Sequence, residues 1–369
     1  MVLSLFKKRE DKIVREQSGG VRYYDLLVED VIRETDDAIT IVLNNPDNKI
    51  NYKSGQYLTL ILQIEGKEER RSYSLSSSPE TDNNLAVTVK KVDRGHVSNY
   101  LNYKLKAGDK IRILEPMGNF TTEFDIDNKR TLLLFAGGSG ITPLISIIKT
   151  ALQKEPKSKV ILVYQNKNLN SIIFKDLINQ LSKKYSDNFK VIHILSKPES
   201  TWHGKSGRIT GDMVKKIVAE ENVNIENTDV FFCGPSGMME TAEHAMEELG
   251  VEKANRHKES FVSSSSKKEK KNVESHSFEE STVTLKLDGE EYQVIVKPNE
   301  FILENALDAD IDVPFSCQSG LCTTCRGKLV AGKVKMEDPD GLTDDEIAQG
   351  YVLTCVSHPA SKEIKIEIG

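Results

Sequence analysis

Four of the five cysteines in this chain lie near its C-terminus, at a spacing that could hold a metal centre. They read C-x4-C-x2-C, with 29 residues before the last one: Cys317, Cys322, Cys325 and Cys355. This is the spacing of plant-type [2Fe–2S] clusters. Three thiolates on one tight loop can wrap a cluster, and a fourth from a distant strand closes it. We therefore predict these four cysteines as cluster ligands.

Two other uses of these cysteines compete with the cluster. Zinc sites usually combine two C-x2-C-like pairs, whereas this segment has one such pair and two single cysteines. A disulfide pair is the third alternative. Since cysteines grouped in this way are more often a metal site in a reducing compartment, the iron–sulfur interpretation is favoured.

A second candidate site is the tetrapeptide Arg71-Ser72-Tyr73-Ser74. On a strand, alternate residues share a face, so Arg71 and Tyr73 can offer a cation to flavin phosphates and a ring to stack on the isoalloxazine. Ser74 can hydrogen-bond the flavin ring edge. Four residues alone also fit an ordinary strand. Downstream, a short turn can begin a helix that holds a pyrophosphate through backbone N–H groups: Gly95, Val97 and Ser98, with His96 as a surface bystander.

A glycine-rich turn after an apolar strand forms a third candidate site. It contains Gly137, Gly138, Ser139 and Gly140, followed by Ile141-Thr142-Pro143. A turn of this kind that opens a helix is a dinucleotide phosphate site. Proline suits the first helical turn, where its missing N–H costs nothing.

The elements that must position these residues change character along the chain. Short strands punctuated by Gly, Asn, Asp and Pro fill residues 21–124, including 38–43, 56–62, 71–75 and 85–90, and predict an antiparallel barrel. Apolar strands then alternate with amphipathic helices, which predicts a parallel α/β sheet. The expected strands are 131–136, 159–164, 190–195 and 229–233, and the expected helices are 142–153, 171–183, 211–220 and 236–249. The C-terminal part begins with a hairpin (282–287 and 292–296) and a helix at 300–308.

We expect a multidomain α+β protein. Its parts are a disordered tail (1–18), an antiparallel Greek-key flavin-binding β-barrel (19–125), a Rossmann-like α/β nucleotide-binding domain (126–262), a flexible linker (263–278) and a β-grasp ferredoxin domain (279–369). The linker is rich in Ser and Lys, and as a random coil it would span roughly 20–25 Å. That length allows the last domain to swing.

Taken in order, these motifs resemble those of the ferredoxin–NADP reductase superfamily, in the class with a C-terminal plant-type [2Fe–2S] ferredoxin domain. Residues 315–327, Phe-Ser-Cys-Gln-Ser-Gly-Leu-Cys-Thr-Thr-Cys-Arg-Gly, carry the ferredoxin resemblance. The glycine-rich turn matches the superfamily's G-G-[ST]-G-[IL]-[TA]-P pattern, and residues 232–239 resemble its C-G-P-x-x-M segment. From about residue 20 to residue 369, the chain is similar to oxygenase reductases of the phenylacetyl-CoA epoxidase and ketosteroid hydroxylase type.

The resemblance implies roles for further residues. Thr142 lies between nicotinamide and flavin, Cys233 faces the nicotinamide with Gly234 and Pro235 beside it, and Glu259 and Phe261 lie near the flavin. Cys233 also fits a buried structural cysteine. Lys197, Lys205 and Arg208 could pair with a 2′-phosphate, which favours NADPH over NADH. Lys167, where relatives often have arginine, leaves this preference open.

The implied function is an NAD(P)H-dependent oxidoreductase. Hydride from NAD(P)H reduces FAD, and single electrons pass through the [2Fe–2S] cluster to a partner oxygenase of the di-iron or Rieske type. FMN is an alternative flavin, but the expected pyrophosphate-binding turn favours FAD. Alternative functions are a reductase for a hybrid-cluster protein or a desaturase, and a redox-sensing regulatory module.

Charge and hydropathy narrow the possible partners. The 369 residues carry a net charge of −6, which argues against nucleic-acid binding. No apolar run approaches the roughly 18 residues that a membrane helix needs, so no membrane insertion is expected. The apolar N-terminal stretch is too short for a signal-peptide core. The expected partners are NAD(P)H and a protein electron acceptor, and the expected location is the cytoplasm.

Overall fold

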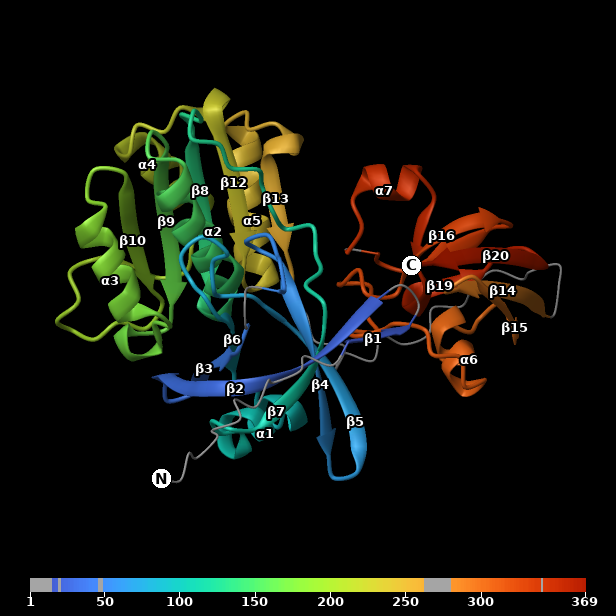
Figure 1. Ribbon diagram of the computed structural model, residues 1–369. Helices are drawn as coiled ribbons and strands as arrows, with labels where there is room; N and C mark the ends of the chain where they lie inside the picture. Colours follow the sequence, from blue (N-terminus) through green and yellow to red (C-terminus); the bar gives the residue numbers. More distant parts are fainter. Residues whose placement is uncertain (1–14, 19–20, 46–48, 262–279, 340) are drawn as a thin grey trace, which may run out of the picture.

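The computed structural model describes residues 15–18, 21–45, 49–261, 280–339 and 341–369. Three parts follow one another along the chain: a curled antiparallel sheet, a parallel sheet flanked by helices, and a smaller mixed sheet (Figure 1). The four C-terminal cysteines lie in the segments that connect the strands of the third part. The predicted multidomain fold class is confirmed. The predicted linker, residues 263–278, lies outside the described residues.

The first part is a seven-stranded antiparallel sheet in the order β5-β4-β7-β2-β3-β6, with β1 paired to β2. A bridge between Leu75 and Val87 joins the two ends of the curled sheet. Its inner face buries aliphatic side chains such as Leu58, Leu60 and Val89. The elements are β1 Arg15–Ser18, β2 Val21–Thr35, β3 Ala38–Leu43, β4 Tyr57–Ile64, β5 Lys67–Ser74, β6 Leu85–Lys90, α1 His96–Lys104 and β7 Lys110–Leu114.

One prediction about the N-terminus is wrong. Residues 15–18, expected at the end of a disordered tail, form β1 and pair antiparallel with residues 21–24 of β2. Backbone pairing with an existing edge overrides the charged, non-periodic sequence, because ladder hydrogen bonds need no apolar side chains. The rest of that predicted tail lies outside the described residues.

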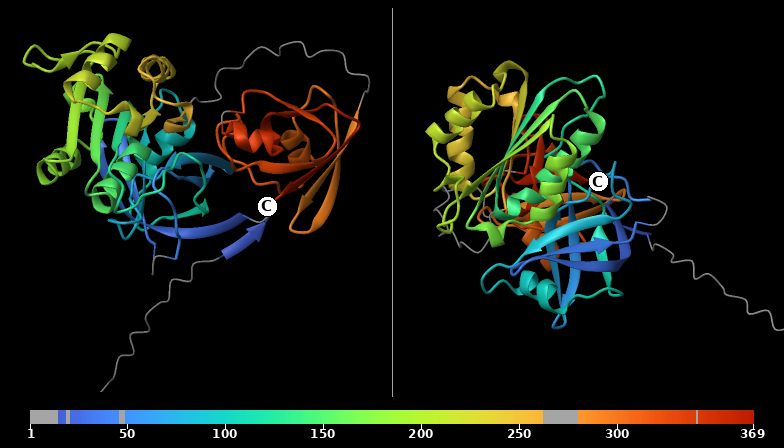
Figure 2. Two further views of the ribbon diagram at one scale, coloured as in Figure 1. Left: turned by 90° about the horizontal axis from the view of Figure 1, so that it is seen from above. Right: turned by 90° about the vertical axis from the view of Figure 1, so that its left-hand side faces the viewer.

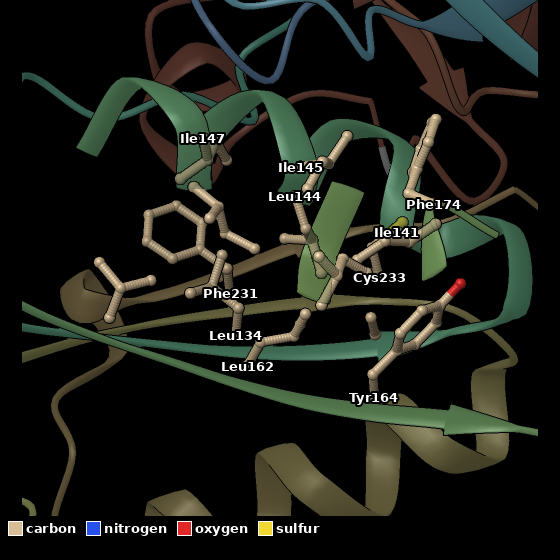
Figure 3. Packing of buried hydrophobic residues seen from close by; sticks show 14 of the residues in the cluster. Leu134, Ile141, Leu144, Ile145, Ile147, Leu162, Tyr164, Phe174, Phe231 and Cys233 are labelled. Carbon is tan, nitrogen blue, oxygen red and sulfur yellow. The ribbon is translucent and has the colours of Figure 1, made fainter. Parts of the chain in front are cut away.

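The second part is a parallel sheet in the order β11-β10-β9-β8-β12-β13. One face packs against α2, where Ile141, Leu144 and Ile147 meet Leu134 and Phe231 (Figure 3). α4 and α5 cover the opposite face. The elements are β8 Thr131–Gly137, α2 Ile141–Lys154, β9 Lys159–Asn166, α3 Lys175–Lys184, β10 Phe189–Leu195, β11 Lys205–Ser206, α4 Gly211–Glu220, β12 Thr228–Cys233, α5 Ser236–Glu248 and β13 Arg256–Glu259.

The helix expected over residues 171–183 begins later than predicted. A 3-10 turn occupies Leu169–Ser171, and α3 starts only at Lys175. Phe174 between them has φ 60°, a left-handed conformation that interrupts a helix. Its ring is buried in the core under α2, so tertiary packing fixes a backbone that local sequence disfavours.

The third part is a five-stranded sheet in the order β15-β14-β20-β16-β18, beside a two-stranded sheet of β17 and β19. Asp288 and Gly289, both with positive φ, form the two-residue turn expected of Asp-Gly between β14 and β15. The elements are β14 Ser281–Leu287, β15 Glu290–Val296, α6 Ile302–Asp308, β16 Arg326–Ala331, β17 Val334–Met336, α7 Asp344–Ala348, β18 Tyr351–Leu353, β19 Ser357–Pro359 and β20 Glu363–Ile368.

The C-terminal sheet lies to one side of the molecule, next to the barrel strands (Figures 1 and 2). A hydrogen bond of 2.7 Å between the hydroxyls of Ser72 on β5 and Ser316 links the two parts directly. Within the described ranges, no helix is both long and apolar enough to cross a membrane.

Candidate functional site

The four C-terminal cysteines meet at one place in the structure. Three lie on a loop that we call the cluster loop, residues 315–327, and Cys355 lies in the short 3-10 turn Thr354–Val356 after β18. The four thiols lie close enough to affect one another's protonation: Cys322 and Cys355 lower the pKa of Cys317, and Cys355 lowers the pKa of Cys325. The backbone N–H of Cys322 points at Sγ of Cys317, with N and Sγ 3.3 Å apart.

The turn that carries Cys355 is fastened to the cluster loop. The backbone N–H and the hydroxyl of Thr354 both donate to the carbonyl of Cys325, each at 3.1 Å. In the described part of the chain, no three or more His, Cys, Asp or Glu side chains surround one point closely enough for a single metal ion. Each iron of a [2Fe–2S] cluster takes two ligands. The cluster loop and the turn after β18 together supply four cysteines, the number of thiolate ligands that a [2Fe–2S] cluster takes.

The predicted flavin residues lie on one strand, but their side chains point to different places. Arg71 is exposed and its guanidinium pairs with Glu69 at 3.1 Å, while Tyr73 packs against the barrel core. Glu69 also lies 3.5 Å from Nδ1 of His96, at the start of α1. Glu69 thus contacts both Arg71 and the Gly95–Ser98 turn, so these two parts of the chain lie near each other.

Three helices begin at the predicted binding turns, and none has a side-chain cap. The cap positions are Gly95 for α1, Gly140 for α2 and Pro235 for α5. Among the other helices, the hydroxyls of Thr210 and Thr343 cap α4 and α7, whereas α3 and α6 also lack a side-chain cap. Because the first N–H groups of a helix lack partners within the helix, uncapped starts leave donors for ligand phosphates. Val97 and Ser98 offer only backbone there, since Val97 is in the core and the Ser98 hydroxyl accepts from Val92 N at 3.1 Å.

The glycine turn and the Cys233 segment pack directly on each other. A Cβ added to Gly140 would lie 2.1 Å from the carbonyl oxygen of Cys233, so no larger residue fits. Thr142 is buried and its hydroxyl donates to the carbonyl of Ser139 at 3.1 Å. Figure 3 shows Cys233 beneath Ile141 at the start of α2.

Glu259, Cys233 and Ser74 come together from three strands. Cys233 and Glu259 are paired neighbours on β12 and β13, and the Ser74 hydroxyl donates to Oε2 of Glu259 at 3.0 Å. Burial raises the pKa of Glu259 to about 8, although the residue keeps some exposed surface. Burial, and secondarily the nearby Glu259, raises the pKa of the Cys233 thiol well above its usual range. Both groups are therefore neutral at pH 7. Phe261, at the end of the described stretch, is 43% exposed.

The three cations predicted to read a 2′-phosphate are not equivalent. Lys205 on β11 is engaged in an ion pair with Glu220, with Nζ and Oε2 3.0 Å apart. Lys197 and Arg208 are exposed near the ends of β10 and β11. The preference for NADPH stays a prediction.

Sequence patterns missed the residues that join the barrel to the cluster loop. Tyr57 on β4 is 6% exposed, and its hydroxyl accepts from the backbone N–H of Thr323 at 3.0 Å. The guanidinium of Arg70 lies 4.3 Å from the ring centre of Phe315. The alternation of residues along β5 places residues 70, 72 and 74 on one face and was the available signal. It does not indicate which part of the protein that face contacts.

Family models match each of the three parts. Residues 26–122 match an oxidoreductase FAD-binding domain, residues 134–244 an oxidoreductase NAD-binding domain, and residues 285–360 a 2Fe-2S iron-sulfur cluster binding domain. The fold and these domains define a flavin- and nicotinamide-dependent oxidoreductase with an iron–sulfur domain, and they favour iron–sulfur over zinc and FAD over FMN.

Full-length relatives identify the family. The chain is 33% identical to a component of 1,2-phenylacetyl-CoA epoxidase from Escherichia coli (94% of this chain, 97% of the relative). It is 36% identical to the ferredoxin reductase component of 3-ketosteroid-9-alpha-monooxygenase from Rhodococcus rhodochrous (95% and 99%). Phthalate dioxygenase reductase shares the fold, with a TM-score of 0.56, 24% identity and coverage of 94% and 98%. The chain belongs to this family of ferredoxin-reductase components, as its motifs predicted.

Proposed function

We propose that this protein is the reductase component of an oxygenase system. It takes two electrons from NAD(P)H and delivers them singly to a separate oxygenase, of the di-iron or Rieske type. Relatives named as oxygenase components support this proposal. The bound cofactors would supply the hydride acceptor, the conversion of two-electron into one-electron transfer, and a carrier with a potential of about −400 mV.

The observation that carries the proposal is the direct contact between the two redox parts of one chain. The cluster loop hydrogen-bonds to Tyr57 on β4 and to Ser72 on β5, and β5 also carries the proposed flavin residues Tyr73 and Ser74. Such contact brings a cluster beside a flavin without help from another protein.

The proposed site residues divide the work. Arg71, Gly95, Val97 and Ser98 bind the flavin phosphates, and Tyr73, Ser74 and Phe261 contact its ring. The nicotinamide nucleotide, preferably NADPH, lies across Gly137, Gly138, Ser139, Gly140, Thr142, Gly234 and Pro235. Cys233 and Glu259, which are neutral at neutral pH, line the hydride-transfer site without placing a charge in it.

We also propose the domain limits given above, apart from β1, and a cytoplasmic location, because a reducing compartment keeps cluster thiols free of disulfides. The test is anaerobic mixing of purified protein with NADPH and, separately, NADH. We expect bleaching of a flavin band, then of a cluster band, with faster reaction for NADPH. Protein that lacks flavin, iron and acid-labile sulfide after reconstitution would contradict the proposal.

The alternative partners remain a hybrid-cluster protein or a desaturase, which co-purification of the natural acceptor separates from an oxygenase. A redox-sensing module is the alternative of another class. Fast steady-state turnover with cytochrome c as acceptor would count against a sensor.

A further inference from the structure

The barrel presents a polar patch to the cluster loop, which we call the docking face: Tyr57, Arg70 and Ser72. Tyr57 on β4 is the cross-strand partner of Ser74 on β5, so both side chains leave the sheet on the same side. Ser72 and Arg70 share that side by strand alternation. The docking face is thus continuous with the residue proposed to contact the flavin ring.

Tyr57 holds the part of the cluster loop between two of the predicted ligands. Its hydroxyl accepts from Thr323 N at 3.0 Å and lies 3.2 Å from the hydroxyl of Thr323 and 3.3 Å from that of Thr324. Thr323 and Thr324 are the two residues between Cys322 and Cys325. One oxygen atom therefore fixes the position of the segment that carries both cysteines.

The tyrosine is itself held in place. Its backbone exchanges two hydrogen bonds with Met117, with N to O distances of 2.8 and 3.0 Å. Its ring packs against Gly118, where an added Cβ would lie 2.9 Å from Cδ1 of the ring. Gly118 has φ 115°, a conformation suited to glycine. A side chain this confined can define a distance between two parts of a molecule.

We propose that Tyr57 is a positioning residue for electron transfer from flavin to cluster. This proposal rests on the proposed function. Each transfer moves one electron from the reduced flavin to the oxidised cluster, and no bond forms or breaks. Its rate depends on how closely and how often the cluster loop sits against the flavin-bearing strands. The hydroxyl of Tyr57 sets that geometry through the Thr323–Thr324 segment.

The direct test is Tyr57→Phe in the full-length protein with both cofactors bound. The variant keeps the ring against Gly118 but leaves the Thr323 N–H without its acceptor. We expect flavin-to-cluster transfer in anaerobic stopped flow to slow about tenfold, which corresponds to about 1.4 kcal/mol and to the usual cost of a buried unpaired donor. Flavin reduction by NAD(P)H and ferricyanide reduction should keep their wild-type rates.

Two further readouts separate positioning from other roles. Amide hydrogen exchange at Thr323, measured on the oxidised protein without turnover, should speed up in Tyr57→Phe, and the midpoint potentials of flavin and cluster should stay at wild-type values. An unchanged transfer rate, unchanged exchange, or a potential shift that accounts for the slower rate would overturn the proposal.

Matched variants complete the design. Tyr52→Phe removes another barrel tyrosine hydroxyl, which donates to Ser77 at 2.8 Å within the same part of the chain, and should leave transfer and Thr323 exchange unchanged. Ser72→Ala, which removes the contact to Ser316, should slow transfer about threefold even if Tyr57→Phe fails to fold. A wild-type protein in which NAD(P)H never reduces the cluster would instead refute the proposed function itself.

Discussion

At the scale of single residues, the proposed chemistry depends on the protonation state of a few buried side chains. Glu259 illustrates this, because burial holds its pKa near 8 while the hydroxyl of Ser74 donates to it. A neutral carboxyl next to a flavin ring can donate a hydrogen bond without adding negative charge. The cluster cysteines illustrate the opposite need, since only thiolates bind iron.

The four predicted ligands give the first prediction. Cys322→Ala removes one thiolate from the cluster loop, so we expect loss of NAD(P)H-driven cytochrome c reduction, by at least about a hundredfold. Ferricyanide can take electrons from the flavin, so that activity should persist at the wild-type rate. Parallel assays with the two acceptors check this, and equal loss of both would contradict the proposed route.

Glu259 gives a prediction about pH. Its pKa is raised from 4.5 to about 8 in the folded protein, so well below pH 4.5 both the folded and the unfolded states hold the proton and this contribution to stability is fully present. As pH rises towards 8, the unfolded state ionises while the folded state does not, and stability falls. Allowing for partial exposure, we expect a loss of about 1–3 kcal/mol in flavin-free protein.

The check is thermal unfolding of flavin-free wild type and Glu259→Gln at several pH values between 5 and about 9. The amide does not ionise, so the variant should lack this component of the pH dependence. Parallel curves for the two proteins would show that Glu259 ionises normally in the folded state.

At the scale of elements, the glycine-rich turn before α2 and the turn between β12 and α5 depend on close contact between their backbones. Gly140 lies against the carbonyl of Cys233, and a Cβ there would clash at 2.1 Å. We expect Gly140→Ala to separate the starts of α2 and α5, lower stability by about 1–3 kcal/mol, and raise the KM for NAD(P)H several-fold.

Gly211→Ala is the control for that variant. Gly211 is the first residue of α4, where an added Cβ meets nothing closer than 3.9 Å. Alanine there should be neutral or stabilise by about 0.4–1 kcal/mol. Denaturant unfolding and steady-state kinetics on both variants test the contrast, and similar behaviour of the two would remove the packing argument.

Much of the fold could be predicted because local signals and tertiary structure agree. The apolar strand before Gly137 and the Asp288-Gly289 turn carry their conformations in their own sequence. The start of α3 was wrong because the left-handed Phe174 is imposed by the core it fills. Tyr57 was missed because its partners lie 266 residues away, and no local pattern records a contact of that separation.

At the scale of the whole molecule, the contact between barrel and C-terminal part is polar. Hydroxyls of the barrel contact the cluster loop at Tyr57 and Ser72, and Asn119 donates to Glu346 at the periphery. Lys253, in the nucleotide-binding part, pairs with Asp344 of the C-terminal part. Polar contacts exchange readily for water, so such an interface can open without exposing a large apolar surface.

Lys253 gives the prediction at this scale. Lys253→Glu places a carboxylate opposite Asp344 at the edge of the C-terminal part, and the two negative charges repel each other. Cluster reduction should therefore slow a few-fold at low ionic strength. The effect should vanish in high salt, because exposed charges are screened. The double variant Lys253→Glu, Asp344→Lys should recover the wild-type rate, and stopped-flow rates across a salt series measure all three proteins.

The hydrogen bond from the Thr323 amide to Tyr57 also affects how another protein could reach the cluster loop. While the amide is bonded to the Tyr57 oxygen, the barrel covers the segment between Cys322 and Cys325, which would hold two of the cluster ligands. An acceptor that approaches from the same direction must first displace the barrel and then offer an oxygen of its own to that amide. The cluster would then receive an electron from the flavin and pass one to the acceptor at different times, never simultaneously.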